Sequence, residues 1–202
     1  MTDRRTELVQ AIVVGPDGTH LEVVDAAMRA SSLALLNRSD DALWLRWLSG
    51  SFTKTVRRVN ATQLENLAAD GTAFVGPNGI AAVAFAPMVL ADLPRPVARA
   101  RVSGLERDRT PQPPLGSGLW VWLNGDLMMS TGKSAAQAAH ALMTWTLMQR
   151  DLPTELPPVQ VAEVDPATFA AGQRDTRYPV ITDAGRTEIA PGSPTAVIVE
   201  VG

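Results

Sequence analysis

The fold is indicated most clearly by residues 126–141, which read DLMMSTGKSAAQAAHA. Two hydroxyl residues in this stretch, Ser130 and Thr131, can cap a helix, and the alanine-rich sequence after them predicts a helix over residues 132–149. Alternating bulky residues at 119–123 precede it and predict a strand. The stretch therefore reads as a strand followed by a helix, the beginning of an α/β unit.

Three polar side chains on this predicted helix share one face. Lys133, Gln137 and His140 are spaced i, i+4 and i+7. A lysine in the first turn opposes the helix dipole, at a cost of roughly 0.3–1 kcal/mol, so Lys133 is expected to do more than aid solubility. The chain has only one other lysine, Lys54, which makes each lysine worth inspecting.

Further elements are predicted on both sides of this stretch. In the second half we expect a strand at 159–164, a helix opening at 165–169, and a hairpin of 188–190 with 195–201 around Pro191 and Gly192. The first half has the same order: a strand at 8–14, a helix at 19–36, extended segments at 43–48 and 54–59, a helix at 61–68 and a hairpin at 72–85.

The common order of elements indicates a duplicated chain. We predict an α/β fold built as a tandem duplication of a small mixed β-sheet unit flanked by helices. The first unit would span residues 1–90 and the second residues 119–202. A proline- and arginine-rich connector, residues 91–118, would join them, because its proline density prevents a long helix or a central strand.

A second motif, DAGRTEIAPGSPT, lies at residues 183–195. Together the two motifs resemble the archaeal-type (type 2) peptidyl-tRNA hydrolases, whose motifs read D-L-x-M-x-x-G-K-x-A-A-Q-x-x-H-A and D-A-G-R-T-x-I-A-P-G-T-x-T. The resemblance covers residues 119–202, with both motifs in the family's order. It implies hydrolysis of the ester between peptide and tRNA, a step of translation, and a type 2 peptidyl-tRNA hydrolase-like fold.

The resemblance also implies a set of site residues. Lys133, Asp183 and Thr187 correspond to the family's catalytic residues. Supporting or substrate-binding roles would fall to six further residues: Gly132, Gln137, His140, Arg186, Ser193 and Thr195. A carboxylate beside an ammonium stays ionised and can orient or deprotonate water, while the ammonium and a hydroxyl stabilise the oxyanion.

Other catalysts in the same region are less favoured. His140 is an alternative base, although a histidine on the inner face of an alanine-rich helix more often has a structural role. Gln137 is expected to position its neighbours by hydrogen bonding. Ser134 and Ser193 lack the Gly-x-Ser-x-Gly elbow of a nucleophilic serine, so covalent catalysis is disfavoured.

The second half departs from the family pattern at basic positions. Asn124, Thr131 and Thr182 stand where the family usually has cations. Fewer cations would weaken contacts to RNA phosphates. The densest arginines lie in or near the connector, at positions 95, 99, 101, 107 and 109; they are either solvated or replace the missing phosphate contacts.

The first half lacks the second half's chemistry and reads as a degenerate copy. Superposing the halves places Leu21 against Lys133, Met28 against His140 and Ala68 against Asp183. Thr72 keeps the place of Thr187. Four tryptophans on predicted strands, Trp44, Trp47, Trp120 and Trp122, are expected to pack in the core rather than stack on bases.

Composition excludes several classes of protein. The chain has 202 residues, 46% hydrophobic and 19% charged, with a net charge of −3, which argues against disorder. It has no cysteine and two histidines, so disulfides, thiolate metal sites and a three-histidine zinc site are impossible. The side chains imply no metal or organic cofactor. The longest apolar run, residues 79–90, is too short to span a membrane, so we expect a cytoplasmic protein without a membrane partner.

Three functions remain open at this stage. The first is peptidyl-tRNA hydrolysis, with peptidyl-tRNA as partner. The second is a catalytically weak or inactive protein that serves as a binding or scaffold module. The third is hydrolysis or group transfer on another small ester or amide. The chain would be either a monomer, with the two units paired as an intramolecular pseudo-dimer, or a homodimer.

Overall fold

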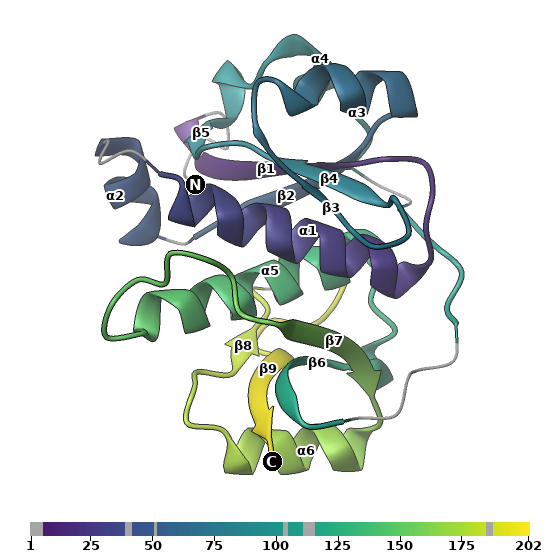
Figure 1. Cartoon of the computed structure of the whole chain (residues 1–202), viewed down its shortest axis with the longest axis vertical. Helices are drawn as coiled ribbons and strands as arrows, with labels where there is room; N and C mark the ends of the chain where they lie inside the picture. Colours follow the sequence, from purple (N-terminus) through teal and green to yellow (C-terminus); the bar gives the residue numbers. More distant parts are fainter. Residues whose placement is uncertain (1–5, 39–41, 51, 103–104, 111–115, 185–187) are drawn as a thin grey trace.

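The structure, a computed structural model, describes residues 6–38, 42–50, 52–102, 105–110, 116–184 and 188–202. It is an α/β protein with two mixed sheets, one from each half of the chain (Figure 1). Among the described residues, no helix is long and apolar enough to span a bilayer.

The first sheet is built around β1 (Leu8–Val14). Strand β2 (Lys54–Arg58) pairs with β1 in parallel, and β4 (Ala81–Ala84) pairs with its other edge in antiparallel orientation. Strand β3 (Thr72–Val75) pairs with β4, which gives the order β2-β1-β4-β3, and the short β5 (Met88–Val89) also pairs with β1.

The second sheet repeats this arrangement around β6 (Gly118–Asn124). Strand β7 (Val159–Val164) is parallel to β6, while β9 (Pro194–Val201) is antiparallel to it on the other side. Strand β8 (Ile181–Thr182) pairs with β9, so the order is β7-β6-β9-β8. The two sheets therefore share both strand order and sense of pairing.

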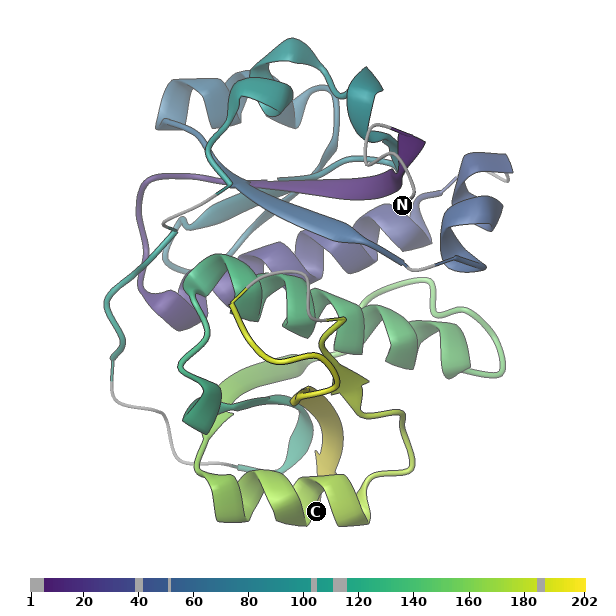
Figure 2. The same cartoon turned by 180° about the vertical axis from the view of Figure 1, so that it is seen from behind.

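Helices fill the space between the sheets and cover their outer faces. The two long helices, α1 (His20–Leu36) and α5 (Thr131–Met148), lie side by side between the sheets (Figures 1 and 2). Helices α3 (Ala61–Ala68) and α4 (Arg95–Arg99) cover the outer face of the first sheet, and α6 (Pro166–Asp175) covers that of the second.

Capping residues begin these helices where the sequence predicts. Thr19 precedes α1 in a capping box, in which the carboxylate of Glu22 accepts the Thr19 backbone N–H at 2.8 Å. Ser130 caps α5 by accepting the Lys133 backbone N–H at 3.2 Å. Asp165 caps α6, and Pro166 occupies its first turn.

The alternation of side chains along the strands divides the core into layers. Ile12 and Val14 of β1 face the central helices, whereas Ala11 and Val13 face α3 and α4. The central layer is rich in alanine on both α1 and α5, and small side chains let the two helices approach closely. One continuous apolar cluster thus contacts both sheets.

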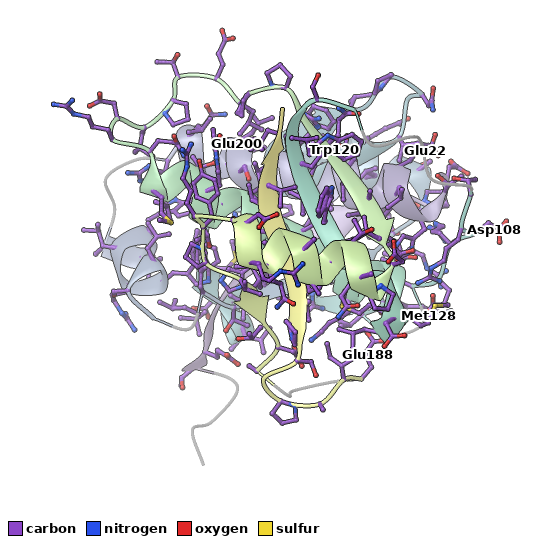
Figure 3. All side chains as sticks on the ribbon, turned by 90° about the horizontal axis from the view of Figure 1, so that it is seen from below. Glu22, Asp108, Trp120, Met128, Glu188 and Glu200 are labelled. Atoms are coloured by element: carbon purple, nitrogen blue, oxygen red, sulfur yellow. The ribbon has the colours of Figure 1, made fainter. Side chains whose placement is uncertain are left out.

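The outer layer of the second sheet contains two of the tryptophans. Trp120 is fully buried among residues of β7, β9 and α6, on the sheet face that α6 covers (Figure 3). Gly172 of α6 lies so close to the ring of Trp122 that a Cβ there would come within 2.8 Å of it. These two tryptophans lie on a strand and pack in or against the core, as expected.

Residues 43–48 are helical rather than extended, and this expectation was wrong. They belong to α2 (Ala42–Leu48), in which Trp44 and Trp47 are both buried. Their rings meet edge to face with centroids 5.6 Å apart. A strand would place residues three apart on opposite faces, whereas a helix places them on the same face, so burial of both rings favours the helix.

The predicted hairpin near the C-terminus has a different first strand. Residues 188–190 form no strand; instead Ile181 and Thr182 pair with β9. Two backbone bonds close the intervening loop at its base: Asp183 N–H to Ser193 O at 2.9 Å, and Gly192 N–H to Asp183 O at 2.8 Å. The loop thereby leaves the sheet at Asp183.

Part of the sequence assigned to the connector packs against the first sheet. Leu93 and Val97 are buried in the cluster between this sheet and its outer helices. Arg101 then exchanges backbone hydrogen bonds with Arg58 of β2, at 2.8 and 3.3 Å. These contacts place residues 90–101 with the first sheet.

A buried polar cluster joins the two halves. The Nδ1 atom of His20, on α1, lies 3.0 Å from the hydroxyl of Thr131 on α5, and its Nε2 atom lies 3.1 Å from Glu163 of β7. Arg109 contacts the same carboxylate at 3.0 Å. Burial alone would raise the pKa of Glu163, but bonds and charges from His20 and Arg109 outweigh it and lower the pKa.

Candidate functional site

A cavity of about 330 Å³ lies between the two halves, at the N-terminal end of α5. One wall is the face of α5 that carries Lys133, Gln137 and His140, a second is the loop that follows β8, and the third comes from β2 and its preceding turn in the first half. Both lysines of the chain, Lys54 and Lys133, line it. Other lining residues include Phe52, Ser130, Gln137, His140, Asp183 and Glu188.

An ion pair forms the centre of this cavity. The Lys133 ammonium donates a hydrogen bond to Oδ1 of Asp183, and the Gln137 amide donates to the same oxygen at 3.3 Å. Asp183 is only 5% exposed. The predicted helical face therefore brings Lys133 and Gln137 into contact with the carboxylate of Asp183, which lies 50 residues after Lys133 in the sequence.

A third polar residue fixes the orientation of the Gln137 amide. The buried hydroxyl of Thr195, on β9, lies 3.0 Å from the amide oxygen of Gln137 and 3.0 Å from the backbone oxygen of Ile181. With its oxygen facing this hydroxyl, Gln137 turns its NH₂ group toward Asp183. Thr195, Gln137 and Asp183 thus form a continuous chain of polar contacts from the sheet to the cavity.

The loop after β8 is tied to the beginning of α5. Ser130 donates its hydroxyl to Glu188 at 2.6 Å, and its backbone N–H reaches the other oxygen of the same carboxylate at 3.2 Å. Figure 3 shows Glu188 on the same side of the molecule as Met128. Glu188 lies within the second motif but had no predicted role, because its contact joins residues 58 positions apart.

The remaining predicted site residues have different placements. Gly132 lines the cavity, and its N–H donates to Leu105 O at 3.4 Å. Ser193 contributes its backbone oxygen to Asp183, as described above. Arg186 and Thr187 lie outside the described residues.

Lys54 is the cavity residue whose role sequence motifs did not suggest. Its ammonium nitrogen is buried without a hydrogen-bond partner among the described residues, 3.8 Å from the ring centroid of Phe52 and 4.7 Å from that of Trp47. Burial lowers the pKa of Lys54 well below its usual value. The scarcity of lysine was the signal that could have identified it.

His140 shares this aromatic wall. Its ring meets Phe52 edge to face at 4.6 Å. Burial, reinforced by the charge of Lys54, lowers the pKa of His140 to about 3. The imidazole is therefore neutral at physiological pH and is a weak base there, so it has no advantage over a carboxylate in accepting a proton.

Replacing Lys54 by methionine is expected to stabilise the fold at neutral pH. Below pH 10.5 the unfolded chain binds a proton that the buried amine resists, so stability falls as the pH drops from 10.5 toward the lowered pKa. Lys54→Met removes this penalty and should gain on the order of 1 kcal/mol at pH 7, or about 2–4 °C in Tm.

Thermal unfolding of both proteins at pH 7 and pH 10.5 measures this effect. The gain should shrink toward pH 10.5, where about half of the unfolded chains already have a neutral amine at this position. A variant that is less stable than the parent at pH 7, or a gain equal at both pH values, would show that the amine is well accommodated in the folded state.

Two of the positions that depart from the family pattern serve the fold. Thr131 contacts His20, as described above. Asn124 donates its side-chain amide to Pro194 O at 3.1 Å and accepts the Asp126 N–H at 3.2 Å. Thr182 is exposed at the cavity.

A second cavity, of about 390 Å³, occupies the corresponding place in the other half. It lies at the N-terminal end of α1, beside the turn between β3 and β4, and its third wall comes from β7 of the second half. Its charged lining residues are Glu22, Asp25 and Arg29, and Arg29 pairs with Asp25 at 2.8 Å.

The structure corrects the register between the two halves. Aligning the helix caps Thr19 and Ser130 places Glu22, rather than Leu21, opposite Lys133. The same alignment places Arg29, rather than Met28, opposite His140.

The register is also wrong near Asp183. Ala68 ends helix α3, whereas Asp183 follows strand β8, so the two residues belong to different elements. Thr72 begins strand β3, which corresponds to β8 in the strand order, and so precedes the turn that matches the Asp183 loop.

No metal site is formed by the described residues, since they contain no group of three or more histidine, aspartate or glutamate side chains able to hold an ion. Comparisons of the chain with protein-family models, curated proteins and solved structures gave no significant match.

Proposed function

We propose that the chain is a peptidyl-tRNA hydrolase, which cleaves the ester between a peptide and the 3′ end of tRNA. The observation that carries the proposal is the Lys133–Asp183 pair, held by Gln137 at the wall of a cavity between the two halves. Both residues are carried by the two motifs that resemble the family. The proposal places the chain in the cytoplasm, with tRNA as its partner.

The two charged groups can divide the work of ester hydrolysis. Asp183 accepts a proton from a water molecule while the oxygen of that water attacks the carbonyl carbon of the ester. The Lys133 ammonium stabilises the negative charge that develops on the carbonyl oxygen. The bond to the ribose oxygen then breaks, and that oxygen takes up the proton, releasing tRNA and a free peptide acid.

Gln137 and Thr195 act as positioning residues in this scheme. The amide of Gln137 holds Oδ1 of Asp183, and Thr195 determines which end of the amide faces the carboxylate. By the family resemblance, Thr187 supplies a further hydroxyl to the oxyanion.

We also infer that the two halves arose by duplication and pair as an intramolecular pseudo-dimer. The shared strand order supports this, and so does the exchange of walls between the cavities. Each cavity combines the helix N-terminus of one half with the parallel edge strand of the other, β2 or β7. Sedimentation of the full chain should give a monomer, and a stable dimer of the whole protein would contradict the inference.

The decisive experiment for the activity is turnover of an N-blocked aminoacyl-tRNA by the purified chain at low salt. We expect release of deacylated tRNA well above the rate of a buffer blank. Hydrolysis equal to the blank would refute the proposed activity and favour a binding or scaffold role. A protein that cleaves simple N-blocked amino acid esters but not the tRNA ester would be a hydrolase of another ester class.

A further inference from the structure

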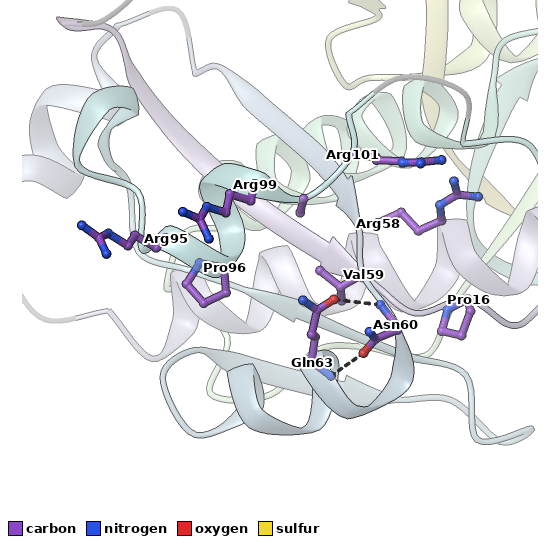
Figure 4. A pocket seen from close by; sticks show the side chains of 10 residues that line it. Pro16, Arg58, Val59, Asn60, Gln63, Arg95, Pro96, Arg99 and Arg101 are labelled. Carbon is purple, nitrogen blue, oxygen red and sulfur yellow. Dashed lines mark hydrogen bonds between the residues drawn. The ribbon is translucent and has the colours of Figure 1, made fainter.

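Arginines gather in a second pocket, of about 560 Å³, on the first half of the chain. It is lined by Arg58 at the end of β2, Arg95 and Arg99 on α4, and Arg101 just beyond α4. Figure 4 shows Arg58 and Arg101 on one side of the pocket and Arg95 and Arg99 on the other.

The four guanidinium groups have no neutralising carboxylate among the described residues. Within the part of the chain that the structure describes, none of them forms an ion pair with a carboxylate. Arg95 and Arg99 are four residues apart on one short helix, an arrangement that mutual repulsion disfavours. Four like charges that line one pocket favour an anionic ligand.

The backbone holds this cluster in place. Arg58 and Arg101 are joined by their two backbone hydrogen bonds, so their side chains start from adjacent positions. Buried Arg57 donates to the backbone oxygens of Val97 and Ala98 at 3.2 Å, which anchors α4 to β2. The pocket is thus built on a strand and an anchored helix.

Two other arginines of the same region do not belong to the pocket. Arg107 donates to Gly15 O at 2.9 Å, and Arg109 pairs with Glu163. Their contacts are with the protein itself. The structure therefore separates the connector arginines into three that line the pocket and two that are engaged in internal contacts.

The arginine pocket adjoins the cavity that contains Lys133 and Asp183. Strand β2 runs from one to the other, with Lys54 in the cavity wall and Arg58 in the arginine pocket. Arg101 lines the pocket and the next residue, Val102, lines the cavity. Four residues of extended strand span about 13 Å, and about four stacked nucleotides of a single strand cover the same length.

We propose that the arginine pocket binds backbone phosphates of the single-stranded 3′ end of an RNA whose terminal ester lies in the cavity. This inference rests on the proposed hydrolase function. Guanidinium groups bind phosphate oxygens through paired hydrogen bonds, and the pocket volume admits more than one phosphate. Asn60 and Gln63, which also line it, supply polar groups for sugar or base edges.

The test compares two triple variants of equal charge. Arg95→Gln/Arg99→Gln/Arg101→Gln removes pocket charge, and Arg46→Gln/Arg150→Gln/Arg174→Gln removes three exposed arginines elsewhere. Binding of deacylated tRNA is titrated at several salt concentrations. We expect the slope of log affinity against log salt to fall by about 2 in the pocket variant and to stay unchanged in the control. With N-blocked aminoacyl-tRNA, the pocket variant should raise KM and leave kcat nearly unchanged.

Each other outcome is decisive. Equal slopes in both variants would overturn the phosphate site even if wild-type turnover confirms the hydrolase. An altered slope in the pocket variant alone, from a protein without turnover, would support the phosphate site and refute the hydrolase. Displacement of tRNA by orthophosphate at equal phosphate concentration would identify a free-phosphate site instead. Tighter binding of poly-glutamate than of RNA would assign the pocket to an acidic protein partner.

Discussion

Asp183→Asn should lower kcat for N-blocked aminoacyl-tRNA by about 10²–10⁴-fold while the chain remains folded. The substitution keeps the shape of the side chain but removes the group that accepts the proton of water. The amide still contacts Lys133 and Gln137, so the cavity keeps its geometry. Asp175→Asn, an exposed change on α6, is the matched control and should leave kcat unchanged.

Lys133 completes this test through a double-mutant cycle. Lys133→Met alone leaves a buried carboxylate without its cation, which should cost about 3–5 kcal/mol of stability as well as the activity. Adding Asp183→Asn to Lys133→Met should recover much of the stability but none of the turnover. Full activity in either single variant would exclude the pair from catalysis.

Leu142→Ala should lower the free energy of unfolding by about 2–5 kcal/mol. Leu142 is fully buried in the central cluster, whereas Leu147 on the same helix is 38% exposed. Leu147→Ala is therefore the matched control, with an expected change within about 0.5 kcal/mol. Urea unfolding followed by tryptophan fluorescence and by circular dichroism measures both variants.

The central cluster also predicts how the chain unfolds. Because it contacts both sheets through α1 and α5, we expect one cooperative transition that both probes report at the same urea concentration. Two separate transitions, with only the second sheet weakened by Leu142→Ala, would show that the halves are independent folding units.

Local patterns were sufficient to predict most elements, because each carries its own start and stop signals. The hydroxyl pair Ser130 and Thr131 predicted the start of one central helix, and alternation predicted the strand at 119–123; the Thr19–Glu22 capping box, found in the structure, begins the other central helix. Residues 43–48 were predicted as extended because bulky and aromatic residues are common in strands, whereas tryptophans three apart share one face only in a helix. Tertiary packing against Phe52 decides between them.

Only the site residues on the predicted helical face and in the two motifs could be predicted from the sequence. Spacing placed Lys133 and Gln137 together, and the second motif supplied Asp183. Lys54 enters the cavity because the two halves pack against each other, and Arg58 joins the arginine pocket through a backbone pairing 43 residues away along the chain. Such contacts depend on the arrangement of whole sheets, which short patterns do not encode.

The paired sheets have a consequence for stoichiometry. In a symmetric homodimer every substitution appears twice, so both sites must change together. In one chain with two similar halves, a substitution changes only one of the two cavities. One cavity can therefore keep the lysine–aspartate pair while its counterpart has Glu22, Asp25 and Arg29. Under the proposed function, the chain therefore has one reactive centre, the cavity with Lys133 and Asp183. The initial rate should rise hyperbolically with substrate concentration, without the cooperativity between sites that a dimer with two identical centres permits.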